Sequence, residues 1–173
     1  MIVSAVRNRR GHSSVTNSAV ATATGTPISR AVAAVKQQAG AIGYVEEAYA
    51  LQNNFTVATV KNKSGAFVAP SLASTTAAGT GIKIPADLGI SIIDSPNPGA
   101  YPISSQTFVI VYKDMCKAGI SKATAQRVKA FIDYGLGAGQ DVLTQLQYAK
   151  LPPELLTKAK AAAGTLQCNG AAL

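Results

Sequence analysis

Residues 106–113 read QTFVIVYK. β-branched and aromatic residues, which β-strands favour, follow one another without interruption from Phe108 to Tyr112. Alternate residues of a strand point to opposite faces, and here both sets are apolar, so the run predicts a central strand buried on both faces. Such strands belong to sheets that helices cover, and the rest of the chain should therefore supply helical layers.

Two helices are predicted downstream of this strand. Ser121 is suited to cap a helix over 122–136, because its hydroxyl can accept a hydrogen bond from a first-turn N–H. The apolar face of that helix would be formed by Ala125, Val128, Phe131 and Ile132. A second helix is expected to start at Pro152-Pro153 and to end at Gly164.

The sequence upstream also alternates between the two kinds of element. A helix is predicted over 27–38, followed by a buried strand over 41–45 and a short helix over 46–51. Strand-like alternation continues over 55–61, and a turn signal then precedes Phe67-Val68. Strands that alternate with helices predict an α/β fold.

Composition excludes several classes of protein. The chain has 173 residues, 47% of them hydrophobic, which argues against disorder of the chain as a whole. One histidine and two cysteines cannot supply the usual four ligands of a zinc site, and no other cofactor motif is present. Trp is absent and aromatic residues are few, which disfavours a base-stacking surface for nucleic acid. No constellation of acid, base and nucleophile predicts an enzyme.

Charge favours anionic partners. Sixteen Lys and Arg against eight Asp and Glu give a net charge of +8. Residues 1–24 are unpatterned and carry Arg7, Arg9 and Arg10, so we expect a disordered or foreign segment there. An arginine arm of this kind attracts nucleic acid without sequence specificity, and no nucleic-acid partner is expected. The segment does not have the order of a signal peptide, in which a basic start precedes a longer apolar region.

The two cysteines allow two interpretations. Cys116 and Cys168 would be ordinary thiols in a reducing compartment. In an exported chain they would form a disulfide that closes a long loop, worth roughly 4 kcal/mol in the chain-entropy model.

Three stretches resemble one family. They are AGAIGYVEEAYALQNN at 39–54, YPISSQTFVIVYKD at 101–114 and FIDYGLGAGQDVLTQLQYAKLPPELLTKAKAA at 131–162. Together, over about residues 25–168, they are similar to the C-terminal half of the phosphate-binding protein of bacterial phosphate ABC transporters. The resemblance implies a partial two-lobed periplasmic-binding-protein fold, α/β in class, with incomplete sheets and flanking helices.

The same resemblance implies a division of the chain and a function. Residues 25–100 would form part of the second lobe, and 101–173 the returning strand and C-terminal helices of the first. Inorganic phosphate would be captured by lobe closure, without cofactor or catalysis, and delivered to membrane permease subunits from the periplasm or the outer face of the membrane. The family's main phosphate ligands lie upstream of the matching stretches, so the chain is expected to be a fragment without them.

Candidate phosphate ligands are few. Arg10, Ser13 and Ser14 faintly echo the family's arginine–serine loop and are the only candidates. The alternative interpretation is a small basic interaction or anion-binding module, which would need a complete core of its own.

Overall fold

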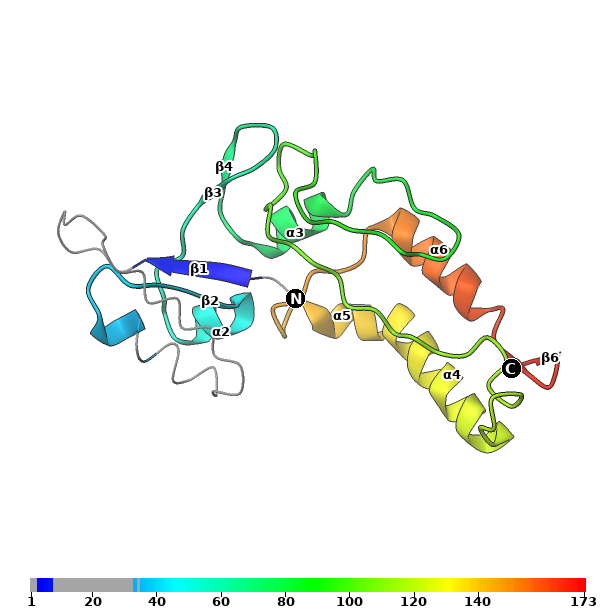
Figure 1. Cartoon of the computed structure of the whole chain (residues 1–173). Helices are drawn as coiled ribbons and strands as arrows, with labels where there is room; N and C mark the ends of the chain where they lie inside the picture. Colours follow the sequence, from blue (N-terminus) through cyan, green and yellow to red (C-terminus); the bar gives the residue numbers. More distant parts are fainter. Residues whose placement is uncertain (1–2, 8–32, 34) are drawn as a thin grey trace. The chain divides into compact units, whose positions relative to one another are not determined.

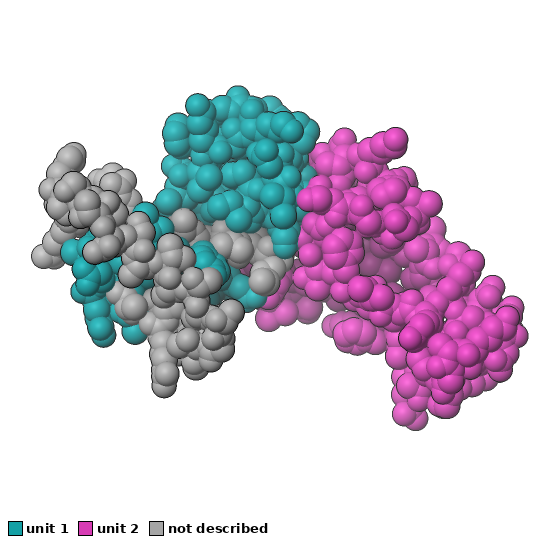
Figure 2. All heavy atoms as spheres, viewed as in Figure 1, with its two compact units in different colours: residues 1–78, 92–105 teal, residues 79–91, 106–173 magenta. Residues whose placement is uncertain are grey.

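The computed structural model describes residues 3–7, 33 and 35–173. The chain divides into two compact units, shown in Figure 2. Unit 1 comprises residues 1–78 and 92–105, and unit 2 comprises residues 79–91 and 106–173. Among the described residues the strands form three two-stranded sheets, and helices make up most of the remaining regular structure (Figure 1).

Unit 1 contains the first sheet. Strand β1 (Val3–Arg7) runs antiparallel to β2 (Ile42–Glu46), with Val3 opposite Glu46, and α2 (Glu47–Gln52) follows directly. The strand predicted over 41–45 and the short helix predicted over 46–51 are confirmed, but the strand is not buried as predicted, because Ile42 and Tyr44 are 63% and 55% exposed. Strand β1 lies in the segment for which the sequence predicts disorder, so that prediction is wrong for residues 3–7. The strand forms because each of its residues lies opposite a residue of β2.

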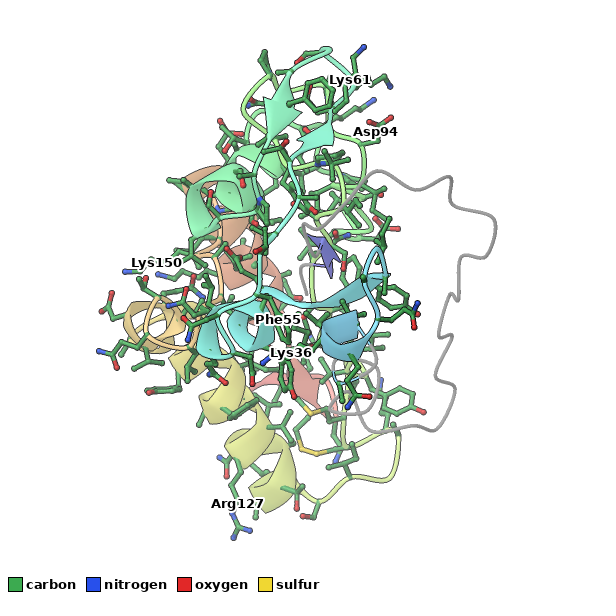
Figure 3. The ribbon with its side chains drawn as sticks, turned by 90° about the vertical axis from the view of Figure 1, so that its left-hand side faces the viewer. Lys36, Phe55, Lys61, Asp94, Arg127 and Lys150 are labelled. Carbon is green, nitrogen blue, oxygen red and sulfur yellow. A yellow bond between two sulfur atoms is a disulfide. The ribbon has the colours of Figure 1, made fainter. Side chains whose placement is uncertain are left out.

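The core of unit 1 forms around α2. Its buried residues are Val35, Val45 and Ala50. Residues 33 and 35–37 are helical, whereas the earlier part of the helix predicted over 27–38 lies outside the described residues. A Cβ at Gly43 would lie 2.8 Å from the Val35 Cγ2, so glycine allows the strand to approach this helical segment closely. The ammonium of Lys36 lies 4.6 Å from the ring centre of Phe55 (Figure 3).

A hairpin and a helix complete unit 1. Strands β3 (Val60–Lys61) and β4 (Phe67–Val68) are antiparallel, which confirms the predicted turn between them but shortens the strand predicted over 55–61. Helix α3 (Leu72–Ala78) was not predicted. Its start is closed by a reciprocal pair of bonds, in which Ser74 N donates to Ser71 Oγ at 3.1 Å and Ser71 N donates to Ser74 Oγ at 3.0 Å.

Asn62 joins the hairpin to a distant loop of the same unit. Its side-chain amide donates to the carbonyls of Pro98 at 2.8 Å and Ala100 at 3.1 Å. Its Oδ1 accepts from the backbone N–H groups of Ser64 and Ala66, both at 3.1 Å. These bonds give a partner to both polar atoms of the side chain, as a buried amide requires.

Unit 2 is mainly helical. It contains α4 (Lys122–Leu136), α5 (Gly139–Leu143) and α6 (Pro153–Ala163). The two long helices are confirmed, and Ser121 caps the first of them by accepting from Thr124 N at 3.3 Å. Helix α5 was not predicted. Helix α4 contacts both α5 and α6.

The core of unit 2 covers only part of the predicted face of α4. Met115, Ala125 and Leu166 are buried together, and Val128 and Ile132 pack against them. Phe131, which was predicted to face inward, is instead 71% exposed. Ile132, the next residue, packs against this core, so the buried stripe of α4 runs along Ala125, Val128 and Ile132 and leaves Phe131 beside it.

The strand predicted over 106–113 does not form. The segment has no regular secondary structure and no strand pairing along its length (Figure 1), and its apolar side chains are exposed. A strand needs a neighbour, and none of the other described residues offers one to residues 107–112. The high β-propensity of these residues is real, but it cannot be satisfied within the described chain.

Candidate functional site

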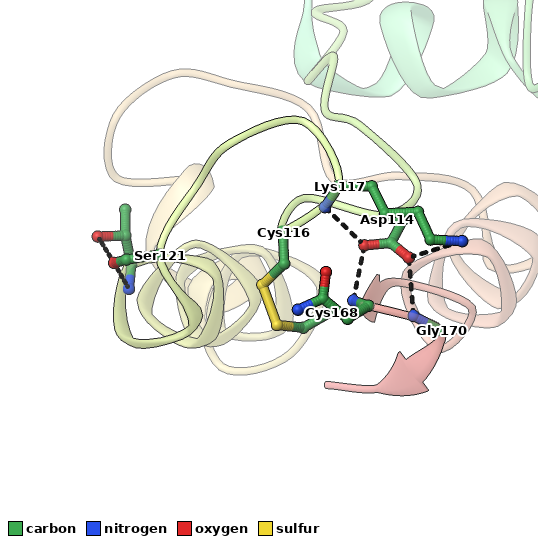
Figure 4. The surroundings of a disulfide bond; sticks show 8 residues. Asp114, Cys116, Lys117, Ser121, Cys168 and Gly170 are labelled. Atoms are coloured by element: carbon green, nitrogen blue, oxygen red, sulfur yellow. Dashed lines mark hydrogen bonds and ion pairs between the residues drawn. A yellow bond between two sulfur atoms is a disulfide. The ribbon is translucent and has the colours of Figure 1, made fainter.

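A polar cluster of unit 2 is built around Asp114, just after the exposed segment at 106–113. The Asp114 Oδ1 accepts from Lys117 N at 3.1 Å and from Asn169 N at 2.8 Å, and Oδ2 accepts from Gly170 N at 2.8 Å (Figure 4). Loss of hydration raises the pKa of Asp114, but these N–H groups and the charge of Lys117 outweigh it and lower the pKa below the ordinary value. The carboxylate is therefore held ionised.

The donors to Asp114 come from a tight C-terminal hairpin. Strand β5 (Gln167–Cys168) pairs antiparallel with β6 (Ala171–Ala172) through Asn169-Gly170. Both turn residues have positive φ, 53° and 83°, which Asn and Gly adopt at little cost in a two-residue hairpin turn. The turn points its two N–H groups at the carboxylate.

A disulfide secures the same hairpin. Cys116 and Cys168 are bonded, with Cα atoms 4.7 Å apart (Figure 4). This confirms the pairing expected for an exported chain. The Asp114 oxygens and both sulfurs are thus occupied by contacts within the chain, and the cluster serves to attach the C-terminus rather than to hold a ligand.

Glu47 is the buried acid of unit 1. It opens α2 and is 5% exposed, and its Oε2 has no hydrogen-bond partner among the described residues. Burial raises the pKa of Glu47. An acidic residue in the first turn of a helix is common on exposed surfaces, so the sequence gives no sign of this burial.

The predicted phosphate ligands cannot be placed. Arg10, Ser13 and Ser14 lie outside the described residues, so the structure does not bring them together with any other group. Across residues 3–7, 33 and 35–173 no three His, Cys, Asp or Glu side chains are grouped so as to bind a metal ion. Within the same ranges no helix has both the length and the apolar character to cross a membrane.

The segment at 106–113 carries five consecutive exposed apolar residues. Its exposed residues are Phe108, Val109, Ile110, Val111 and Tyr112. Solvent exposure of consecutive large apolar residues is typical of surfaces that another polypeptide covers.

Comparison with known protein families identifies the superfamily of the chain. The family model of the PBP superfamily domain matches residues 5–138, which is most of the chain and includes the exposed segment. The chain belongs to this superfamily. The α/β class predicted from the sequence is that of the superfamily, and the helices and small sheets of the structure agree with it.

Individual relatives make the assignment within this superfamily more specific. The chain is 35% identical over 122 residues to the phosphate-binding protein PstS of Pasteurella multocida, a match that covers 69% of this chain and 34% of the relative. It is 32% identical over 118 residues to PstS of Methanocaldococcus jannaschii, covering 63% and 30%. To PstS3 of Mycobacterium bovis it is 28% identical over 142 residues, covering 78% and 37%. The predicted resemblance to phosphate-binding proteins is thereby confirmed, and this PBP superfamily member is PstS-like.

The matches also show how much of each relative the chain covers. The chain spans about one third of the length of the relatives that it matches.

Proposed function

We propose that the chain forms the C-terminal portion of the substrate-binding component of a phosphate ABC import system. The match to PstS proteins over 122 residues carries this proposal. In the complete protein, phosphate would be held between two lobes that close around it, and no bond of the substrate would be made or broken. The chain would thus take part in binding and transport, not in catalysis.

The chain would contribute to both lobes but would not bind phosphate tightly by itself. We propose that residues 25–100 belong to the second lobe and 101–173 to the first. The main ligands would lie in the two thirds of the fold that the match does not include. Arg10, Ser13 and Ser14 remain candidates for additional contacts, because an arginine and hydroxyls are groups that bind phosphate oxygens.

The working location would be outside the cytoplasm, at the periplasmic or outer face of the membrane, where permease subunits would receive the phosphate. The Cys116–Cys168 disulfide supports this location, because such bonds persist in oxidising compartments and are rare in the cytosol.

A chimaera tests the proposal. The third of Pasteurella multocida PstS that matches would be replaced by the matching residues of this chain, and phosphate binding would be measured by calorimetry with sulfate as the competing anion. We expect phosphate-selective binding to the folded chimaera, and none to the relative from which that third has simply been deleted. A folded chimaera that binds neither anion, or binds both equally, would overturn the proposal.

A further inference from the structure

The turn of the C-terminal hairpin is the one place in the sequence where an asparagine precedes a glycine. Both residues of the pair, Asn169 and Gly170, are exposed, and both have positive φ. The geometry suits a two-residue hairpin turn, but the same pair of residues is chemically the least durable peptide unit that an asparagine can form.

An Asn-Gly pair can react within itself. The backbone nitrogen of the glycine loses its proton to water and attacks Cγ of the asparagine side chain. The new N–Cγ bond closes a succinimide ring, while the side-chain –NH₂ group takes up a proton and leaves as ammonia. Water then opens the ring to aspartate or isoaspartate. Glycine favours the attack, because it has no side chain to obstruct the approach of its nitrogen.

Asn54 provides a comparison within the same chain. It is also exposed, and its φ of 52° is close to the 53° of Asn169. The residue that follows it is Phe55, whose ring hinders the attacking nitrogen. Exposure and backbone conformation are therefore shared by the two asparagines, and the following residue distinguishes them.

Asp114 binds the nitrogen that would react. Gly170 N donates to Asp114 Oδ2 and Asn169 N donates to Asp114 Oδ1, both at 2.8 Å (Figure 4). The proton that must be lost is thus shared with a carboxylate. The charge of that carboxylate also opposes ionisation of the Gly170 N–H, because ionisation creates a second negative charge beside the first.

Neighbouring contacts keep the turn at Asp114. Cys168, next to the turn, is bonded to Cys116, which lies two residues after Asp114. Gln167 N also donates to the carbonyl of Lys113, the residue before Asp114, at 2.8 Å. The turn therefore leaves the carboxylate only when the hairpin opens locally.

From these observations we propose that Asn169 is a site of spontaneous deamidation, which Asp114 suppresses for as long as the hairpin stays attached. Deamidation places a second carboxylate beside Asp114, and repulsion between the two charges weakens the attachment of the C-terminus. The change is a lasting record of how often the hairpin has opened. It goes beyond the proposed function and does not depend on it.

Mass spectrometry of the full chain tests the proposal. The oxidised parent and Asp114→Ala would be incubated at neutral pH, and the C-terminal peptide would be analysed at intervals. We expect Asn169 to deamidate roughly 10-fold faster in the variant, the factor expected from losing hydrogen bonds to a charged acceptor. Asn54 should stay unmodified over the same period in both proteins.

Two comparisons separate local protection from a general loss of stability. Ser121→Ala removes the cap of α4 in the same unit, where Ser121 accepts from Thr124 N, and leaves the bonds of Asp114 in place. It should not change the rate at Asn169. In urea with the disulfide reduced, the parent and Asp114→Ala should react at one common rate, faster than that of the folded parent.

The consequence for the hairpin is measured separately. The deamidated parent would be isolated by ion exchange, because it carries one more negative charge, and it should melt at a lower temperature than the unmodified chain. Equal melting temperatures would overturn the effect assigned to the second carboxylate.

Several results would overturn the suppression by Asp114. They are equal rates in the folded parent and Asp114→Ala, equal acceleration by Asp114→Ala and Ser121→Ala, and an Asn169 that reacts as fast in the folded parent as in urea. If circular dichroism shows that Asp114→Ala does not fold, the comparison of the folded and the unfolded parent decides.

Discussion

The backbone N–H of Gln167 donates to the carbonyl of Lys113, which joins the exposed segment to the C-terminal hairpin of unit 2. The next residue, Asp114, binds the turn of that hairpin, and Cys116 is bonded to Cys168 within it. Three kinds of contact therefore fix the C-terminal end of the exposed segment.

Replacing Asp114 tests the contribution of its hydrogen bonds. Asp114→Asn removes the charge and turns an amide N–H₂ group toward at least one backbone donor, so we expect a lower melting temperature of the chain at pH 7. Thermal unfolding followed by circular dichroism measures it. Lys117→Gln is the control, because that lysine is exposed and lies 3.9 Å from the carboxylate, and it should change stability by no more than about 0.5 kcal/mol.

The effect of Asp114→Asn should depend on pH. The pKa of Asp114 is lower in the folded chain than in the unfolded chain, where it is about 3.9. The stabilisation is then complete above the unfolded pKa and is lost as the pH falls through the folded pKa. The melting temperatures of the parent and the variant should converge in acid. A difference that stays constant from pH 7 to pH 2 would contradict this account of the carboxylate.

The disulfide is expected to make a large contribution to the stability of unit 2. Cys116 and Cys168 are 52 positions apart, so their bond restricts a long loop of the unfolded chain. The Cys116→Ala/Cys168→Ala variant should lose roughly 4 kcal/mol of unfolding free energy. Urea unfolding measures the loss, and reductant should lower the midpoint of the parent but not that of the variant. Equal midpoints for the two oxidised proteins would show that the bond adds nothing.

The local elements near this disulfide were predictable to different degrees. Helix α4 was predicted over its full length, because Ser121 supplies a cap and the apolar spacing is regular. The β5–β6 hairpin was not predicted, although Asn169-Gly170 is the typical sequence of a two-residue hairpin turn. The strands on either side have only two residues each, too few to show an alternating pattern.

Glu47 should destabilise the folded chain at neutral pH. Its pKa is raised by burial, so the folded state favours the protonated acid and loses stability as the pH rises from the unfolded pKa, about 4.3, through the folded pKa. Glu47→Gln keeps the shape without the charge and should raise the melting temperature at pH 7. The gain should disappear below pH 4. A variant less stable than the parent at pH 7 would mean that the carboxylate has a partner essential to the fold.

Asn62 tests the attachment of the β3–β4 hairpin to the loop at 98–100. Asn62→Ala removes all the bonds of a buried side chain and leaves the carbonyl of Ala100 without its donor, so we expect a loss of about 2–4 kcal/mol. Asn97→Ala is the matched control, because its side chain accepts a single exposed bond from Gly99 N and should cost about 1 kcal/mol or less. Equal effects in urea unfolding would contradict the role assigned to Asn62.

The two largest differences from prediction have physical causes that sequence patterns do not contain. The run at 106–113 has the residues of a central strand, but a strand exists only where another backbone pairs with it, and propensity alone does not supply the partner. Phe131 was assigned to the apolar face of α4, yet it stays exposed because the stripe that packs against the core runs along Ala125, Val128 and Ile132 and leaves Phe131 beside it. Both assignments rested on local pattern, which does not show which neighbours the folded chain provides.

The long-range polar contacts were missed for a related reason. Asn62 and Asp114 precede turns in a polar context, where exposure is the usual state. Their bonds reach residues 98–100 and 169–170, and such long-range partners cannot be read from one sequence. The sequence signal at α3 was present in Ser71 and Ser74, whose spacing is that of a capping pair, but the Ala- and Thr-rich stretch that follows has weak apolar periodicity.

The central claim is that this PstS-like chain needs the rest of the fold to bind phosphate, and calorimetric titration of the purified chain with phosphate at neutral pH tests it most directly, with sulfate as the control. We predict no phosphate-selective heat. Selective binding of micromolar or tighter affinity by the chain alone would contradict the claim.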